Sequence, residues 1–415
     1  MRPLCRRFCL AAAIAVVACQ SPTDAGGHQS APLAALPRAL TIAEQQALAG
    51  TTTFGLALFR QVNAAHRGEN VFVSPLSASL ALGMALTGAS GATLESMRAT
   101  LGWGARPMAE INAAYKGLAD LLIALDPAVS FLSANSIWAR QGLPVLQPFT
   151  AANQQTFAAT TRLLDFASAA AAPTINTWVS EATNGRITSI VSAPIDPAMV
   201  MFLINAIWFK GSWRDQFKVT DTRAAPFMNA AGDTSSVPMM TRTGRVRFVG
   251  GTLAHGADLP YGNGAFSMVI LLPRFGQTVE QLVDSLTGAT WQAAIADAAT
   301  SVAANGMVSL PKFTLSFDAR LNAPLQALGM GIAFSDLADF SRMTPVSVAI
   351  SEVRQKTWVQ VNEEGTEAAA VTSIGIGITS GPPSLRVDRP FVFAIRERFS
   401  GALLFVGKVA RLPAS

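Results

Sequence analysis

The residue types that carry out acid-base or nucleophilic catalysis are scarce in this chain. It holds three histidines and three cysteines in 415 residues, namely His28, His66, His255, Cys5, Cys9 and Cys19. A nucleophilic Ser or Cys needs a positioned base, and no Gly-x-Ser-x-Gly turn accompanies any histidine. No Cys/His pair has the spacing of a metal site. The sequence therefore predicts a protein that is not an enzyme and that has no metal and no cofactor.

Two basic segments could bind anions. The stretch from Gly401 to Lys408 approximates a phosphate-binding loop, but it has one residue too many between its glycines and no Ser or Thr after the lysine. We interpret it as a buried strand. The group Arg242, Arg245 and Arg247 could bind a polyanion, and we favour a solvated hairpin instead.

The N-terminus has the layout of an export signal. Cationic residues precede an apolar run, and the run ends at Val16-Val17-Ala18-Cys19, which resembles a bacterial lipobox. We predict a lipoprotein signal peptide over residues 1–18 and a lipidated Cys19 that begins a flexible tether over residues 19–45. An ordinary signal peptide that happens to end in Cys is the alternative.

The charge and the hydropathy limit the partners. The net charge of +5 falls by three when the arginines of the signal segment are removed, which is too little to predict nucleic-acid binding. No stretch after the signal reaches about 18 apolar residues, so the lipid alone is expected to contact the membrane. The protein is then exported and lipid-anchored to the cell envelope, on its periplasmic face or the cell surface, or is extracellular.

The stretch from Trp358 to Arg389 is unusual because it resembles a strand but ends like a loop. Its apolar and small residues alternate, and no charge occurs from Ala368 to Leu385. Gly365 and a Pro-Pro pair at 382–383 mark its two ends. An exposed uncharged strand favours edge pairing, so the segment should be hidden in some state of the protein. On pattern alone, a long central strand explains it as well as a loop does.

The surrounding elements predict an α+β fold. Thr41 to Glu44 has the form of a capping box, which predicts a helix up to about Ala64. A short strand stopped by Pro75 precedes a buried helix over residues 76–87, and helical texture continues to residue 182. From residue 199 onward, β-branched and aromatic runs between Gly and Pro predict strands. Helices that precede strands favour α+β over a repeated βαβ pattern.

Six short motifs follow one another along the chain: Asn70–Ser77, Asn205–Trp213, Pro238–Met240, Leu259–Tyr261, Leu310–Phe313 and Arg389–Ile395. In this order they resemble the serpin family, from about Phe54 to Pro413. The resemblance implies a single domain over residues 46–415, in which helices pack around a large central mixed β-sheet with smaller sheets and an exposed reactive loop. It also implies a monomer.

The resemblance assigns site residues. The hinge of the reactive loop comprises Glu363, Glu364, Gly365, Thr366, Glu367, Ala368, Ala369 and Ala370. The scissile bond falls between Thr379 and Ser380, with Ile378 as the alternative residue before the cut. The shutter and breach, which control opening of the main sheet, comprise Ser74, Ser77, Asn205, Trp213 and Gln355. Gln355 departs from the family pattern, because many inhibitory members have His there.

The resemblance implies an inhibitor that a serine protease attacks as a suicide substrate, giving a covalent acyl complex when the cut loop enters the main sheet. A small hinge suits rapid insertion, and the small, uncharged Thr379 suits elastase-like or subtilisin-like proteases. The alternatives are a non-inhibitory serpin-fold binding protein and a cross-class inhibitor of a cysteine protease.

Overall fold

The computed structural model describes residues 31–366 and 383–414, and in this part of the chain the strands form three sheets. The largest has the order β1-β15-β14-β8-β7-β6-β9-β13, with β5 paired to β6. Its strands are β1 Val71–Val73, β5 Arg223–Met228, β6 Thr234–Val249, β7 His255–Pro260, β8 Phe266–Leu272, β9 Ala304–Pro311, β13 Ser384–Arg386, β14 Phe391–Glu397 and β15 Leu403–Val409.

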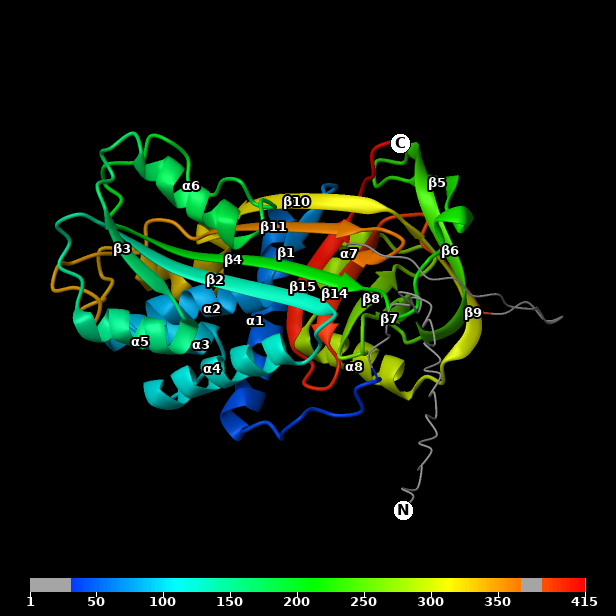
Figure 1. Ribbon diagram of the computed structural model, residues 1–415, viewed down its shortest axis with the longest axis horizontal. Coiled ribbons are helices and arrows are strands. Elements are labelled where there is room, and N and C mark those ends of the chain that lie inside the picture. The colour runs from blue at the N-terminus through cyan, green and yellow to red at the C-terminus, as the bar shows by residue number, and fades with distance from the viewer. Residues whose placement is uncertain (1–30, 367–382, 415) are drawn as a thin grey trace, which may run out of the picture.

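Two smaller sheets lie beside each other in Figure 1. One has the order β12-β4-β2-β3, and the other pairs β10 with β11. Their strands are β2 Val129–Arg140, β3 Thr160–Leu164, β4 Met201–Ser212, β10 Phe313–Arg320, β11 Arg354–Val361 and β12 Gly365–Thr366.

Helices cover both faces of the four-stranded sheet. Figure 1 shows α2, α3, α4 and α5 gathered below it and α6 above it. The helices are α1 Ile42–Ala65, α2 Pro75–Leu86, α3 Gly91–Thr100, α4 Met108–Ala124, α5 Gln147–Phe157, α6 Ala171–Ala182, α7 Val279–Ser285, α8 Gly288–Thr300 and α9 Asn322–Leu325. This arrangement of helices around mixed sheets confirms the predicted α+β class.

Local signals in the sequence account for several of these elements. The side chain of Thr41 accepts the backbone N–H of Glu44 at 3.1 Å, and the Glu44 carboxylate accepts the Thr41 N–H at 2.8 Å. This capping box starts α1, as predicted. At the start of α2 the Ser74 hydroxyl accepts the Ser77 N–H, and Pro75 follows at the first helical position. All residues of β15 are buried, so the strand interpretation of the segment ending at Lys408 is confirmed.

Residues that precede α1 also pack against the core. Leu33, Leu36 and Leu40 pack against the core, and the Leu33 N–H donates to the Asn263 carbonyl at 2.9 Å. Their apolar side chains account for this packing. Among the described residues no helix is long and apolar enough to cross a membrane.

The prediction of continuous helical texture up to residue 182 is wrong for β2 and β3. Strand β2 is rich in Ser, Ala and Asn, which have weak β propensity. It pairs with β4 along most of its length, from Val129 opposite Gly211 to Ala139 opposite Met201. This partner lies some seventy residues away in the chain, and long-range pairing outweighs the local propensity.

The prediction of a solvated hairpin is wrong for Arg242. This residue lies within the 16-residue strand β6, which pairs with β9, and it is 8% exposed. Its guanidinium lies 5.6 Å from the centre of the Phe217 ring and 3.9 Å from a carboxylate oxygen of Asp215. Burial lowers the pKa of Arg242, and Asp215 opposes this effect. Arg245 is exposed and Arg247 is half-buried.

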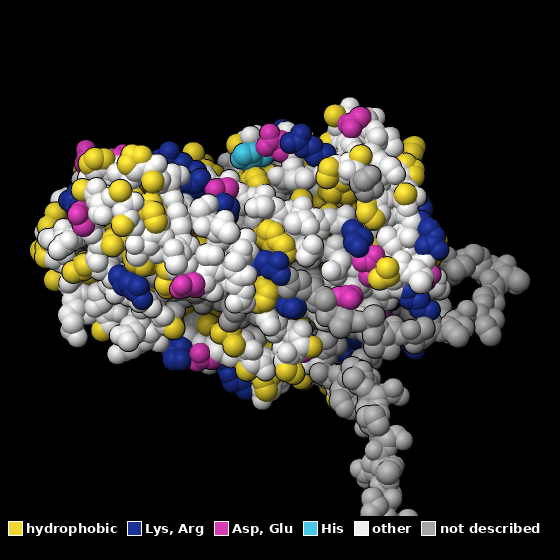
Figure 2. Space-filling view, turned by 45° about the horizontal axis from the view of Figure 1, so that its top comes forward, with side chains coloured by type: hydrophobic (Ala, Val, Ile, Leu, Met, Phe, Trp, Pro, Cys, Tyr) yellow, Lys and Arg dark blue, Asp and Glu magenta, His cyan; other side chains and the backbone are white. Residues whose placement is uncertain are grey.

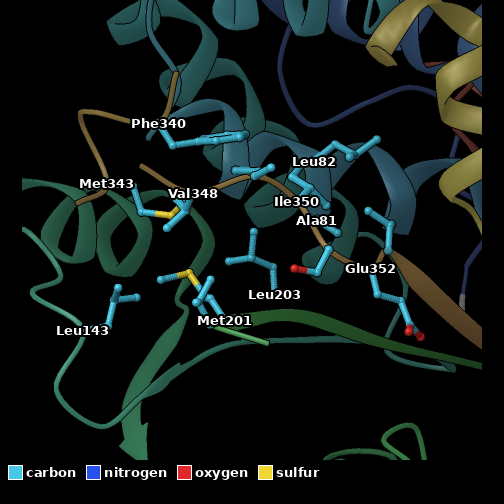
Figure 3. Close-up of a pocket in the computed structure, with 15 residues that line it drawn as sticks. Ala81, Leu82, Leu143, Met201, Leu203, Phe340, Met343, Val348, Ile350 and Glu352 are labelled. Atoms are coloured by element: carbon cyan, nitrogen blue, oxygen red, sulfur yellow. The ribbon is translucent and has the colours of Figure 1, made fainter. Parts of the chain in front are cut away.

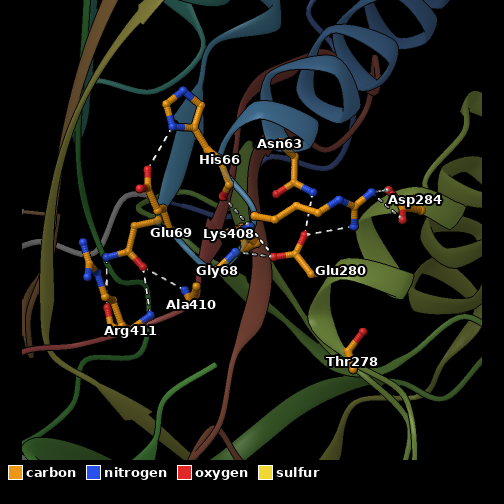
Figure 4. Close-up of polar contacts among 12 residues, drawn as sticks. Asn63, His66, Gly68, Glu69, Thr278, Glu280, Asp284, Lys408, Ala410 and Arg411 are labelled. Atoms are coloured by element: carbon orange, nitrogen blue, oxygen red, sulfur yellow. Dashed lines mark hydrogen bonds and ion pairs between the residues drawn. The ribbon is translucent and has the colours of Figure 1, made fainter. Parts of the chain in front are cut away.

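A cluster of charged and polar side chains connects α1, α7 and β15 (Figure 4). The side chain of Lys408 is fully buried, and its Nζ lies 2.6 Å from Glu280 Oε1. Asn63 Nδ2 and the Gly68 N–H also donate to the Glu280 carboxylate, at 2.7 and 2.9 Å. Burial lowers the pKa of Lys408, and the bond to Glu280 opposes this effect. These contacts give the lysine a structural role instead of a phosphate-binding one.

Candidate reactive-loop hinge and shutter

Strands β4 and β11 lie next to each other, but no β-ladder joins them within the described residues. β12 begins a strand between them. Gly365 pairs with Ser212 of β4 on one side and forms a bridge with Asn362, just after β11, on the other. The backbone groups on the facing edges of β4 and β11 are therefore placed to pair with one further strand. A strand that continued β12 would run antiparallel to β4 in this gap.

The hinge is a tight turn from Asn362 to Gly365. The Asn362 side-chain oxygen accepts the backbone N–H groups of Glu364 and Gly365, at 3.1 and 3.2 Å. Gly365 has φ +142°, and a Cβ there would lie 2.6 Å from the Cα of Ser212. Only glycine adopts this conformation and tolerates this approach without strain. The turn therefore fixes the point at which the chain leaves β11 and enters the gap.

The Glu363 side chain anchors the hinge. It is 4% exposed, and its carboxylate lies 2.8 Å from Lys312 Nζ and accepts the Thr222 hydroxyl at 2.7 Å. Burial alone would raise the pKa of this carboxyl, but the hydrogen bonds from Lys312 and Thr222 outweigh burial and lower it. The backbone carbonyl of Glu363 also accepts the Phe217 N–H at 2.9 Å. The carboxylate is thus held in its charged form, and it ties the turn to the residue between β9 and β10 and to the segment before β5.

Trp213 lies at the end of the gap next to the hinge. Its backbone N–H donates to the Glu364 carbonyl at 2.8 Å, and its indole N–H donates to the Asn362 carbonyl at 3.0 Å. Its ring stacks on Tyr261, with ring centres 4.4 Å apart. Trp213 was expected in the breach from the sequence. Tyr261 and Asn362 were not assigned to the site, although Tyr261 lies within a motif that carries the resemblance and Asn362 directly precedes the predicted hinge.

Gln355 joins β11 to the first turn of α2. Its side-chain amide donates to the Ser74 carbonyl and accepts the Ser74 N–H, both at 2.9 Å. The Ser74 hydroxyl donates to the Leu404 carbonyl at 2.7 Å. Gln355 is 4% exposed, and its amide supplies both a donor and an acceptor.

Asn205 joins β4 to the same turn of α2. The Ser77 hydroxyl donates to the Asn205 side-chain oxygen, and the Asn205 amide donates to Asn135 of β2 at 2.6 Å. Ser77 N–H in turn donates to the Ser74 hydroxyl at 3.2 Å. The two strands that do not pair with each other are thus each attached to one helix N-terminus, and a movement of either strand must break buried hydrogen bonds.

The other predicted residues lie outside the described part of the chain: residues 1–18, Cys19, Glu367, Ala368, Ala369, Ala370, Ile378, Thr379 and Ser380. Of Thr366, the backbone alone is described, in β12 opposite Gly211. Within the described residues no group of three or more His, Cys, Asp or Glu side chains is placed to hold a metal ion.

The two smaller sheets together form the sheet that the resemblance calls the main one, and it is divided between β4 and β11. Because the chain turns back into this division at β12, the protein is able to accept a strand of its own. The family model for "Serpin (serine protease inhibitor)" matches residues 49–412. The chain belongs to the serpin family, whose members are described as protease inhibitors and not as catalysts.

Known proteins are similar in sequence or structure to this chain along most of their length. The chain is 35% identical to Iripin-3 from Ixodes ricinus over 83% of this chain and 90% of that protein. It is 33% identical to the leukocyte elastase inhibitor of Sus scrofa over 88% of this chain and 99% of that protein. Among solved structures, the thermophilic serpin tengpin in its native state matches with a TM-score of 0.81 and 30% identity, over 92% of this chain and 97% of tengpin.

Proposed function

We propose that this serpin inhibits serine proteases as a suicide substrate. The protease cuts the reactive loop between Thr379 and Ser380, and the cut segment enters the gap between β4 and β11 before the acyl bond is hydrolysed. The observation that carries the proposal is the position of Gly365, which is bridged to both sides of that gap. Insertion of a reactive loop into the main sheet is a known form of strand addition.

The register of β12 predicts the neighbours of the inserted hinge. Gly365 pairs with Ser212 and Thr366 with Gly211. Continued residue by residue in the antiparallel direction, this register places Ala370 opposite Ile207. Cross-strand partners share a face of the sheet, and a Cβ at Gly211 would point at the rings of Tyr261 and Phe209. The even-numbered hinge residues would therefore enter the core, where small side chains fit between large ones.

The same register predicts the neighbours of the lower half of the inserted loop. Ile374 would lie opposite Leu203, and Ile376 would lie opposite Met201. Both β4 residues line an apolar pocket under the sheet, shown in Figure 3, whose other walls include Leu82, Phe340, Met343 and Ile350. Each isoleucine buried there would stabilise the inserted state by about 1.5–3 kcal/mol. The match between loop pattern and pocket supports insertion in this register.

The residue before the cut determines the proposed target class. Thr379 is small and uncharged, so it suits the small or apolar primary pocket of elastase-like or subtilisin-like proteases. The similarity to a protein named leukocyte elastase inhibitor supports this choice.

A covalent-complex assay with elastase tests the proposal. We expect a band that survives denaturing detergent and has the combined mass of protease and inhibitor. The Thr366→Arg variant should be cleaved without forming this band, because a charge would have to be buried opposite Gly211, whereas Thr366→Ser should still form it. Plain cleavage of the unaltered protein would indicate a non-inhibitory serpin, and a stable complex with Thr366→Arg would contradict insertion. In mass spectrometry, the released C-terminal fragment should begin at Ser380.

We also propose that the protein is a bacterial lipoprotein, a monomer held to the membrane by a lipid on Cys19. The sequence Val16-Val17-Ala18-Cys19 after an apolar run supports this proposal. Cells that express the protein should incorporate labelled fatty acid into it, and Cys19→Ser should abolish the label. Equal labelling of both proteins would contradict the anchor.

A further inference from the structure

A cleft of about 550 Å³ lies where β6 and β7 meet the turn after β14, next to the segment that follows Trp213. Residues 32–34 form part of its wall. Its charged lining residues are Arg214, Arg245, Arg247, Arg398, Asp215 and Asp258. The lining therefore has an excess of two positive charges, in a concave site that the hinge and the shutter do not use.

One buried carboxylate faces several of these guanidinium groups. Asp258 is 4% exposed, and its Oδ2 lies 3.2 Å from Arg396 Nη2 and 3.7 Å from Arg398 Nε. Arg247 is the cross-strand partner of Asp258. Burial lowers the pKa of Arg398, and the charges of Arg247 and Arg396 lower it further, while Asp258 opposes them. Glu397, which is also buried, acts on Arg398 in the same sense as Asp258. The lining arginines still outnumber the lining carboxylates of Asp215 and Asp258 by two, so positive charge stays uncompensated at this point.

Donors of the same arginines lack acceptors. The Nε atoms of Arg396 and Arg398 are buried and make no hydrogen bond within the described part of the chain. The side chain of Arg396 is 4% exposed, and buried polar groups of this kind normally have a partner. Arg245 and Arg247 lie two residues apart on one face of β6. A guanidinium presents five donors in a planar fork that matches carboxylate and phosphate oxygens.

We propose that this cleft binds a small multivalent oxyanion, a compound with neighbouring phosphate or carboxylate groups, through Arg245, Arg247 and Arg398. The excess charge favours an anion, and the unused donors favour oxygen acceptors. The site does not depend on protease inhibition, because none of the hinge or shutter side chains lines it, although Arg214 directly follows Trp213.

Calorimetric titration of the full chain with inorganic pyrophosphate tests the proposal. We expect saturable binding to one site, weaker at higher salt because the attraction is electrostatic. The double variant Arg245→Gln with Arg247→Gln should bind at least tenfold more weakly. The matched control is Arg162→Gln with Arg320→Gln, which removes the same charge from exposed positions on β3 and β10. This control should bind within twofold of the unaltered protein.

Folding should not obscure the result, because neither Arg245 nor Arg247 makes a hydrogen bond or an ion pair within the described residues. An unchanged melting temperature of the double variant would verify this, and Arg398→Gln provides a second variant that should also bind at least tenfold more weakly.

Citrate should displace pyrophosphate, since it carries the same oxyanion chemistry on carboxylates. Equal weakening in the cleft variant and the control would indicate diffuse surface attraction and overturn the proposal. Binding only of a sulfated polysaccharide, or no binding of either small anion, would overturn it as well.

Discussion

Replacement of Gln355 by Met should destabilise the uncut protein, because it removes both hydrogen bonds between β11 and α2 while it keeps the length of the side chain. The Ser74 carbonyl retains a partner, since it also accepts the Ala78 N–H at 3.0 Å. The Ser74 N–H loses its only acceptor among the described residues and stays buried. An orphaned donor costs about 1–3 kcal/mol, and the second lost bond costs about 0.5–1.5 kcal/mol. The free energy of unfolding should fall by about 1.5–4.5 kcal/mol.

Thermal unfolding of the uncut protein measures this effect. For a domain of this length the unfolding entropy is about 0.8 kcal/mol per kelvin, so the melting temperature should fall by roughly 2–6 °C. Gln360→Met is the matched control, because Gln360 lies on the same strand at a half-buried position of the alternate face. It should melt within about 1 °C of the unaltered protein. If Gln355→Met also melts within that range, the proposed role of the amide in holding β11 to α2 is wrong.

Three further changes test the hinge and the core. Gly365→Ala should destabilise the uncut protein by at least about 1–3 kcal/mol, because alanine is strained at φ +142°; chemical denaturation measures this, and an unchanged midpoint would contradict the turn geometry. Glu363→Gln should lower stability near neutral pH. Because the folded-state pKa of this carboxyl is lowered, its contribution is full above the unfolded pKa and is lost as the pH falls through the folded pKa. The difference between variant and unaltered protein should therefore vanish in acid; a pH-independent difference would contradict the assignment. Lys408→Met should cost about 3–5 kcal/mol, because it removes the closer of the two cations that face the partly buried Glu280 carboxylate and leaves only Arg67 at 3.7 Å. Adding Glu280→Gln should recover part of the loss in urea unfolding; no recovery would show that the pair is not coupled.

Predictions from local sequence signals agree best with the structure. The capping box at Thr41 starts α1. The alternation before the hinge also holds, since Gln355, Thr357, Val359 and Val361 are buried while the residues between them are half-buried. In these cases a residue's neighbours in the chain determine its conformation, so a short pattern is sufficient.

Features that depend on distant partners were not predictable. Glu363 contacts Thr222 and Lys312, which lie 141 and 51 residues away in the chain, and no local pattern marks these pairs. Arg242 looked solvated because charged residues usually are, but the ring of Phe217 covers it. The missing ladder between β4 and β11 likewise has no signature in either strand, because both are ordinary strands that end beside the hinge.

Comparison of the melting temperatures of cut and uncut protein tests the central claim most directly. The protein is cleaved within the reactive loop by a protease that it does not trap, and both forms are heated under the same conditions. If the cut loop fills the gap between β4 and β11, the new strand adds backbone hydrogen bonds and buries isoleucines, so the cut form should melt at a higher temperature. A cut form that melts at the same or a lower temperature would contradict the account.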